Sequence, residues 1–182
     1  MEIRGKKAIL RGWRESNAEE LTLLVQDRQI PRFTRIPWPY KLKDAKKFIR
    51  ECREKGKKRT EFGFAIISSE SKKIVGSIGI IGIDRHSRKA EIGYMLGKEH
   101  RGKGFMTEAV QLALGFAFGK LKLNRVRISC STRNKASRKV IEKAGAKFEG
   151  IEREACISAL GEKHDLRVYS ILKSEFKRRH RA

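Results

Sequence analysis

The residues best suited to chemistry lie in a glycine-containing segment, residues 97–105, between a predicted strand and a predicted helix. In Arg-Gly-Lys-Gly, Gly102 and Gly104 are small enough to let backbone N–H groups approach a phosphate at the positive end of the helix. Arg101 and Lys103 add positive charge. This segment therefore predicts a binding site for a diphosphate that needs no metal.

Two other kinds of phosphate loop fail here on single residues. The spacing from Gly97 to Gly102-Lys103 fits a Walker loop, but Gly104 stands where a hydroxyl must hold magnesium. A dinucleotide-binding loop would need glycine or alanine at Thr107. An ordinary turn between strand and helix is the structural alternative, because a glycine loop alone is a weak signal.

Two further motifs accompany the loop. One is Ala-Glu-Ile-Gly-Tyr at residues 90–94, and the other runs from Asn134 through Ser137 to Gly145. With Arg-Gly-Lys-Gly-Phe-Met-Thr-Glu-Ala at residues 101–109, they resemble the GNAT superfamily of N-acetyltransferases, especially its RimJ/RimL branch, which acetylates ribosomal proteins. The resemblance implies an α+β fold, with a mixed, splayed sheet flanked by helices on both faces, and acetyl-CoA as co-substrate without a metal.

The same resemblance assigns the contacts to the cofactor. It implies that acetyl-CoA lies between the strands at residues 90–96 and 126–131, with its pantetheine arm along the backbone of residues 94–96. The expected cofactor-binding residues are Tyr94, Met95, Leu96, Arg101, Gly102, Lys103, Gly104, Phe105, Met106, Asn134 and Ser137. The alternative for Asn134 is that it only forms the turn before its helix.

Attack of an amine on a thioester needs a group that accepts a proton and a group that donates one. The resemblance points to Glu91 as the base, directly or through water; the alternative is an ion pair with Arg127 across the sheet. The family's usual acid is a tyrosine at the position of Ile141, so the acid role falls to Ser137. The alternative for Ser137 is a cap or hydrogen bond within its own helix.

The chain departs from RimL-like enzymes at one catalytic position. These enzymes carry a glutamate nineteen residues after the motif serine, where this chain has Cys156. Glu152 and Glu154 lie nearby, and either of them, Glu91 or water remains a candidate for the base. We interpret Cys156 as a small core residue, because free cysteine usually behaves as a buried hydrophobe.

Three further residues carry weaker expectations. Trp38 and Tyr40 fall where family members build the wall of the acceptor site, and the alternative is a hydrophobic plug under their loop. Asp165 is expected to brace the last hairpin.

The charge of the chain is spread over its whole length. The formal net charge is +23, with 23 basic and 12 acidic residues up to residue 91 and 21 and 9 after it. Such a body attracts polyanions such as RNA, phosphates or CoA, and repels polycations. It predicts weak association with RNA or the ribosome, to which the basic end at residues 173–182 could contribute; the alternative is solubility in a thermophile's charge-rich chain.

Composition excludes several other classes of protein. The length of 182 residues predicts one domain over residues 1–182, with its motif-bearing core at about 62–172. Three distant cysteines and four scattered histidines indicate neither disulfides nor a metal site. The longest apolar stretch, residues 74–83, is too short to span a membrane, and the N-terminus lacks a signal peptide, so we expect a cytoplasmic monomer or homodimer.

Hydrophobic periodicity predicts the elements that must position these residues. A capping box at Ser16 and Glu19 should begin the first helix. The predicted helices lie at residues 16–25, 42–52, 105–118 and 135–144, with an extended loop at 36–40. The predicted strands lie at residues 61–66, 74–83, 90–96, 126–131, 147–157 and 165–172.

The expected activity is acetyl transfer to the N-terminal α-amine of a protein, such as a ribosomal protein, by direct attack in a ternary complex. An α-amine with a pKa of about 8 is easier to neutralise than lysine, whose pKa is about 10.4. The alternatives are a small-molecule acetyltransferase acting on polyamines, aminoglycosides or amino acids, and an RNA- or ribosome-binding module in which catalysis is secondary.

Overall fold

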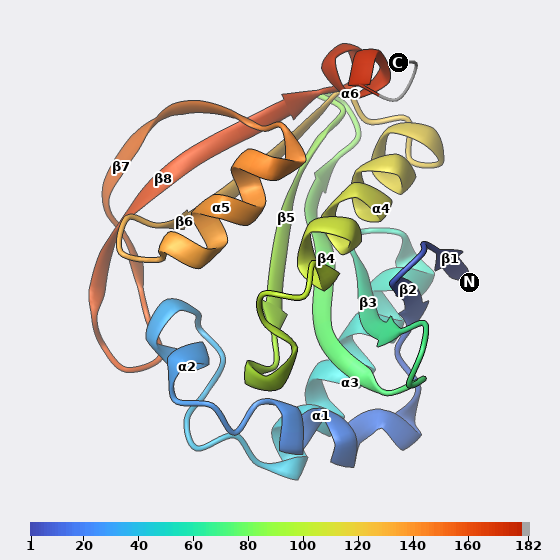
Figure 1. Ribbon diagram of the computed structural model, residues 1–182, viewed down its shortest axis with the longest axis vertical. Coiled ribbons are helices and arrows are strands. Elements are labelled where there is room, and N and C mark those ends of the chain that lie inside the picture. The colour runs from blue at the N-terminus through green and yellow to red at the C-terminus, as the bar shows by residue number, and fades with distance from the viewer. Residues whose placement is uncertain (180–182) are drawn as a thin grey trace.

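The computed structural model describes residues 1–179, and in them a single eight-stranded sheet runs through the molecule (Figure 1). Its strand order is β1-β2-β3-β4-β5-β6-β8-β7, and all neighbours are antiparallel except β5 and β6. The strands are β1 (Glu2–Arg4), β2 (Ala8–Gly12), β3 (Phe62–Ser68), β4 (Ile74–Asp84), β5 (Lys89–Leu96), β6 (Arg125–Ser131), β7 (Lys147–Ile157) and β8 (Lys163–Leu172).

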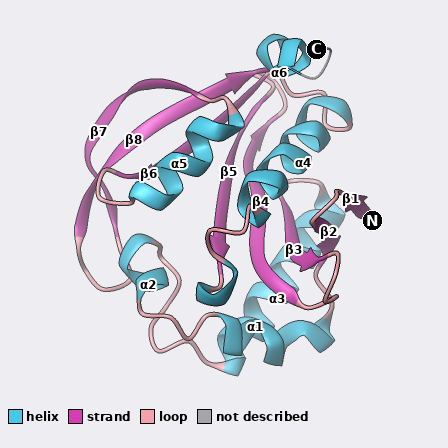
Figure 2. Cartoon of the chain, in the orientation of Figure 1, coloured by secondary structure: helices cyan, strands magenta, loops and turns pink. Residues whose placement is uncertain are grey.

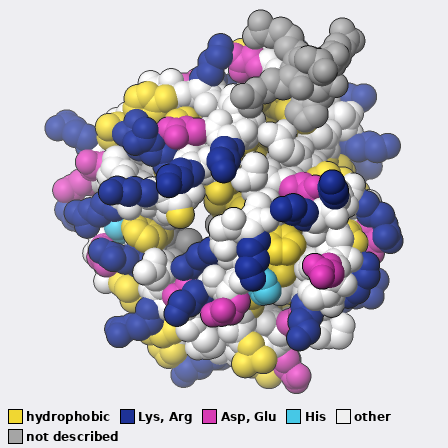
Figure 3. All heavy atoms as spheres, viewed as in Figure 1, with side chains coloured by type: hydrophobic (Ala, Val, Ile, Leu, Met, Phe, Trp, Pro, Cys, Tyr) yellow, Lys and Arg dark blue, Asp and Glu magenta, His cyan; other side chains and the backbone are white. Residues whose placement is uncertain are grey.

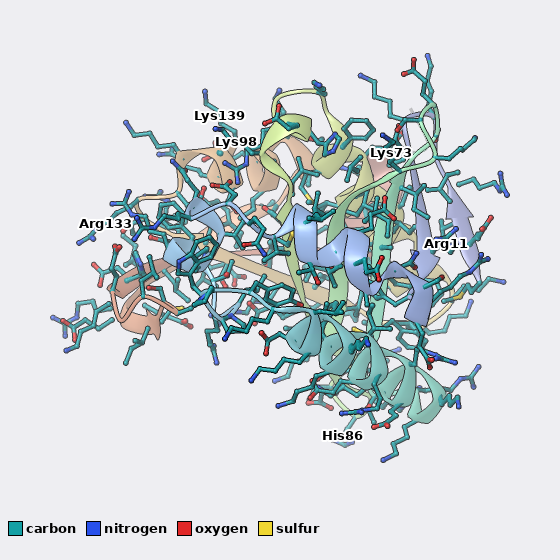
Figure 4. All side chains as sticks on the ribbon, turned by 90° about the horizontal axis from the view of Figure 1, so that it is seen from below. Arg11, Lys73, His86, Lys98, Arg133 and Lys139 are labelled. Carbon is teal, nitrogen blue, oxygen red and sulfur yellow. The ribbon has the colours of Figure 1, made fainter. Side chains whose placement is uncertain are left out.

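Helices cover both faces of this sheet, as predicted (Figure 2). The α-helices are α1 (Ala18–Leu24), α2 (Gln29–Phe33), α3 (Leu42–Lys58), α4 (Phe105–Gly119), α5 (Lys135–Ala144) and α6 (Lys173–Arg179), and the short 3-10 helices are η1 (Glu15–Asn17) and η2 (Lys98–His100). Helices α4 and α5 lie on one face, and α1 and α3 on the other, which Figure 4 brings to the front. None of the described helices is both long and apolar enough to cross a membrane.

Two hydrophobic clusters hold the layers together. The larger packs α4 and α5 against the sheet, and in it Phe116 makes edge-to-face contacts with Phe62 and Phe64 at ring distances of 5.2 and 5.6 Å. The smaller packs α1, α2 and α3 on the opposite face, and includes Ile49, fully buried, and Met95 of β5. Each large apolar side chain buried in this way contributes roughly 1.5–3 kcal/mol.

The sheet opens between its two parallel strands. β5 pairs with β6 only from Lys89, opposite Arg125, to Glu91, opposite Arg127. Beyond Glu91, β5 has no strand partner on that side among the described residues, while β6 stays paired with β8 along its length. This confirms the predicted splayed sheet, and the opening lies between α4 and α5 (Figure 1).

The turn between β1 and β2 is fastened to the first turn of α4. The carboxylate of Glu108 accepts hydrogen bonds from the backbone N–H groups of Lys6, Lys7 and Ala8, at 2.8, 2.7 and 2.6 Å. The start of α4 is thereby held against the edge of the sheet.

Three predictions about local structure were wrong or incomplete. There is no capping box at Ser16: the chain makes the 3-10 turn η1, in which the Asn17 side chain accepts the N–H of Arg14 at 3.1 Å, and α1 begins at Ala18. β1 and β2 were not predicted as strands. Neither was α2, whose Pro31 lies in its first turn, where proline is tolerated. Of the basic end at residues 173–182, residues 180–182 lie outside the described residues.

Candidate active site

A cavity of about 400 Å³ occupies the opening between β5 and β6. Its walls include Tyr94 and Met106 from the α4 side of the sheet and Met95 and Ile30 from the α1 side. The cavity therefore reaches both faces of the sheet, so that two molecules could meet in it from opposite sides.

Most of the predicted cofactor residues come together in this cavity. Those that line it are Tyr94, Met95, Leu96, Arg101, Gly102, Gly104, Met106, Asn134 and Ser137. Lys103 and Phe105 belong to the same loop and helix start but do not line it.

The loop before α4 has the backbone that the glycines predicted. Gly102 and Gly104 adopt φ angles of +76° and +87°, which side chains with a Cβ rarely adopt, and Gly104 directly precedes the first residue of α4. A Cβ on Gly104 would lie 3.6 Å from Nζ of Lys7, whose ammonium donates to the carbonyl of Lys103 at 3.2 Å. The guanidinium of Arg101 is paired with the carboxylate of Asp27. Exposed N–H groups, a helix start and nearby cations fit the diphosphate of CoA.

Ser137 lies beside two other polar groups in the cavity. Its Oγ is 2.8 Å from the hydroxyl of Tyr94, which also donates to the Ser137 carbonyl at 3.3 Å. Cys130 of β6 lines the same part of the cavity. Burial raises the pKa of both Tyr94 and Cys130, so both stay protonated near neutral pH. The site thus holds exchangeable protons without a charge.

The helix cap at α5 is Asn134. Its side-chain oxygen accepts the N–H of Ser137 at 3.0 Å, so the structural role considered for Asn134 is present alongside its place in the cavity wall. Because Asn134 does the capping, the Ser137 hydroxyl is not the cap of its own helix.

Glu91 does not itself line the cavity. Its Oε1 accepts the hydroxyl proton of Ser129 at 2.8 Å, and Ser129 does line the cavity. Its Oε2 lies 3.6 Å from Nε of Arg127, so the alternative ion pair is also present. A proton could therefore pass from the cavity to Glu91 through the Ser129 hydroxyl.

The other two candidate bases lie outside the cavity wall and are paired. Glu152 binds the guanidinium of Arg127 at 2.8 and 2.6 Å, and these hydrogen bonds lower the pKa of Glu152. Glu154 pairs with Lys163 at 2.8 Å, and its side chain is 64% exposed.

The remaining predicted residues lie away from the cavity wall. Trp38 is half-buried, and Tyr40 is buried in the smaller cluster, where burial raises its pKa. Cys156 is half-buried at the edge strand β7 rather than in the core. The carboxylate of Asp165 accepts the N–H of Glu154 at 2.8 Å, which confirms that it braces the last hairpin.

Several residues at the site carried no signal that sequence reasoning used. Helix α2 supplies Gln29, Ile30 and Phe33 to the cavity wall, and Lys7 reaches the phosphate loop from the distant β1–β2 turn. Ser129 lines the cavity only because the pairing of β5 with β6 ends at Glu91 and Arg127. All of these placements depend on contacts between distant parts of the chain.

The charged side chains that line the cavity are basic. Arg101, Lys139 and Lys143 line it, and no aspartate or glutamate is among its lining residues. Figure 3 shows that Lys and Arg side chains are scattered over the visible face without forming one patch. In Figure 4, Lys98 and Lys139 project toward the same side of the molecule. Residues 1–179 contain no cluster of His, Cys, Asp and Glu that could hold a metal ion.

A family model described as an acetyltransferase (GNAT) domain matches residues 7–147. The chain belongs to the GNAT family. It is 36% identical over 157 residues to a probable N-acetyltransferase, YjcK, of Bacillus subtilis strain 168, a match that covers 84% of this chain and 87% of the relative. The putative ribosomal N-acetyltransferase YdaF of the same strain is 42% identical over 103 residues, 57% of this chain and 56% of YdaF.

One more distant relative is named for a different acceptor. A spermidine N(1)-acetyltransferase of Vibrio cholerae is 27% identical over 112 residues, 61% of this chain and 64% of that enzyme.

Solved structures share the whole fold. A probable acetyltransferase superposes with a TM-score of 0.86 at 29% identity, covering 96% of this chain and 98% of the other. The microcin C7 self-immunity acetyltransferase MccE, in complex with acetyl-CoA and AMP, gives 0.82 at 26%, covering 92% and 93%. RimL in complex with coenzyme A gives 0.86 at 20%, covering 96% and 99%, and shows the fold alone. This GNAT protein is an N-acetyltransferase that uses acetyl-CoA, as its sequence motifs predicted.

Proposed function

We propose that this GNAT protein acetylates the N-terminal α-amine of a protein, such as a ribosomal protein. The observation that carries the proposal is the cavity wall, whose described lining residues include three basic side chains, one of them paired with Asp27, and no carboxylate. Such a wall suits an anionic donor such as acetyl-CoA and an acceptor with a single amine. The name of YdaF, a putative ribosomal N-acetyltransferase, supports the same class of acceptor.

The second candidate is a polyamine acetyltransferase, which the similarity to the spermidine enzyme favours. Spermidine carries two further positive charges besides the reacting amine, and each needs an acidic partner. The lining residues provide none, and the net charge of +23 repels polycations over a Debye length of about 8 Å. We therefore favour the α-amine.

The hydrogen bonds of Ser137 and Glu91 support a role for each of them. Acetyl-CoA supplies the thioester when bound, along the unpaired edge of β5. Ser137 holds a proton at Oγ next to the buried Tyr94 hydroxyl, which makes it the proton donor to the departing sulfur. Glu91 receives the proton of the amine through the Ser129 hydroxyl.

The strength required of this base depends on the amine. At pH 7.5 an α-amine with a pKa of about 7.7–8.0 needs only a few tenths of a kcal/mol to lose its proton, but lysine needs about 4 kcal/mol. Glu91 is shared with Arg127 and reaches the cavity only through Ser129, so it can act on the amine only indirectly. Indirect proton removal suits the α-amine better than lysine.

The test compares kcat/KM for two versions of one peptide and for spermidine. One version has a free N-terminus and acetylated lysines, and the other has an acetylated N-terminus and free lysines. We expect the first to react at least tenfold better than either alternative. Preference for the lysine peptide or for spermidine would refute the α-amine assignment and leave the family membership intact.

A further inference from the structure

Two serine hydroxyls line the cavity from the same strand. Ser129 and Ser131 are two residues apart on β6, so their side chains lie on one face of the sheet, and Cys130 between them points to the other. Glu91, which bonds Ser129, lies on this same face. Because Cys130 belongs to the α4 side, the two serines lie on the side from which an acceptor would approach.

The hydroxyl proton of Ser129 points to Glu91 and away from the cavity. Its partner Glu91 is a carboxylate, which only accepts hydrogen bonds, so the Ser129 hydroxyl must donate to it. Toward the cavity Ser129 can therefore offer only oxygen lone pairs.

The hydroxyl of Ser131 is oriented by a buried histidine. Its Oγ accepts the N–H of Arg133 at 3.2 Å and lies 3.0 Å from Nδ1 of His164, a residue that is 2% exposed. A carboxylate oxygen of Glu162 lies 3.8 Å from Nε2 of His164, and its negative charge favours the proton on Nε2. Nδ1 is then an acceptor and takes the hydroxyl proton of Ser131.

The side chain of His164 is enclosed by its neighbours. Nε2 has no hydrogen-bond partner in the described part of the chain, and the ring of Phe33 packs at a centroid distance of 5.7 Å. Arg32 and Arg133 approach Glu162 at 3.6 and 3.8 Å, and Cys156 faces His164 from β7. The imidazole is held in place, and its one firm hydrogen bond is to Ser131.

We propose that Ser129 and Ser131 form an amine-binding pair, with Glu91 and His164 turning both hydroxyl protons away from the acceptor. Residues two apart on a strand have Cα atoms about 6.6 Å apart, which leaves room for one amine nitrogen between the two side chains. An amine nitrogen between the two oxygens can donate to both, whereas an alcohol has one proton and can satisfy only one. The pair therefore selects an amine as acceptor.

This inference deepens the proposed function and rests on it, because it names the residues that hold the amine. His164 is a positioning residue: it does not contact the acceptor, but it accepts the Ser131 hydroxyl proton and so keeps that proton directed away from the acceptor. Its loss should weaken acceptor binding and leave binding of acetyl-CoA unchanged.

The experiment measures kcat and both KM values for the wild type and four variants, with whichever amine the wild type acetylates best. Ser131→Ala should raise the acceptor KM about five- to tenfold, the effect of one lost hydrogen bond, with kcat and the acetyl-CoA KM within about twofold. His164→Leu should act in the same direction. His164→Asn should restore the acceptor KM, because its amide oxygen can replace Nδ1 as the acceptor. Ser170→Ala is the control. Ser170 lies on β8 away from the cavity, where its hydroxyl bonds Arg125 and Glu149.

The outcomes separate the two proposals. An acceptor KM for Ser131→Ala within twofold of the wild type overturns the amine-binding pair, whichever amine is used. An acetyl-CoA KM that rises as much as the acceptor KM in the His164 variants also overturns it, because the effect is then structural. A preference for spermidine or lysine contradicts only the α-amine assignment, and a wild type that acetylates no amine overturns both.

Discussion

Replacing Glu108 with alanine should destabilise the protein and loosen its phosphate loop. The carboxylate accepts three backbone N–H groups, those of Lys6, Lys7 and Ala8. Of these residues only Ala8 is fully buried, so its N–H would lose its partner without gaining water. That bond to a charged group is worth about 1.5–3 kcal/mol, and the two exposed bonds add about 0.5 kcal/mol each.

The total loss is about 2.5–4 kcal/mol of unfolding free energy, or a fall in Tm of about 5–16 °C for a chain of this size. Alanine is the best helix former, so helix propensity in α4 cannot cause such a fall. Thermal unfolding followed by circular dichroism measures it. The matched control is Glu70→Ala, which removes the same charge from an exposed turn between β3 and β4.

The hydrogen-bond reasoning would be refuted if the two variants lowered Tm equally. We also expect weaker acetyl-CoA binding in Glu108→Ala. Glu108 holds the backbone of Lys7, and the Lys7 ammonium contacts the loop before α4 at the carbonyl of Lys103. Glu108→Gln should fall between alanine and the wild type, since its amide keeps one accepting oxygen.

Gly104→Val should weaken acetyl-CoA binding measured by calorimetry, because a β-branched residue is strained at a φ of +87°; Gly119→Ala, in open space, is the control and should change nothing. Hydrogen bonds to Arg125 and Arg127 lower the pKa of Glu149 and Glu152 in the folded protein. The stability that these pairs contribute is therefore present above the usual glutamate pKa of about 4.3, and it is lost as the pH falls through the lowered pKa values of the folded state. The urea midpoint should therefore drop on acidification, and less steeply in the double variant Glu149→Gln, Glu152→Gln; an unchanged slope would contradict this. Burial raises the pKa of Cys52 to about 12, so in the folded protein at pH 8 alkylation followed by mass spectrometry should label Cys52 after Cys156; the reverse order would contradict the assignment.

Sequence reasoning succeeded where the signal was local. Helix α5 begins and ends where predicted, because Asn134 caps its start and Gly145 adopts a φ of +89° at its end. The backbone of residues 101–104 was likewise predictable, since two glycines with positive φ stand directly before an apolar helix. The open sheet was expected from family resemblance rather than from periodicity.

Prediction failed where distant segments meet. Strand β1 has three residues and helix α2 five, too few for a periodic pattern to emerge. The contact between Tyr94 and Ser137 joins β5 to α5 across the opening, and that between Ser131 and His164 depends on the register of β6 against β8. A single sequence does not specify such registers, so the hydroxyl partners of the site emerge only from the folded chain.

The opening between β5 and β6 also bears on where a second chain could add a strand to the sheet. A sheet normally exposes unpaired backbone groups at its two outer edges, where another chain can add a strand and start aggregation. Here two further edges, from Ile92 to Leu96 on β5 and along the facing side of β6, lie inside the molecule. Helices α4 and α5 flank them, so these inner edges should be harder for a strand of a second folded copy to reach than the outer edges at β1 and β7 (Figure 1).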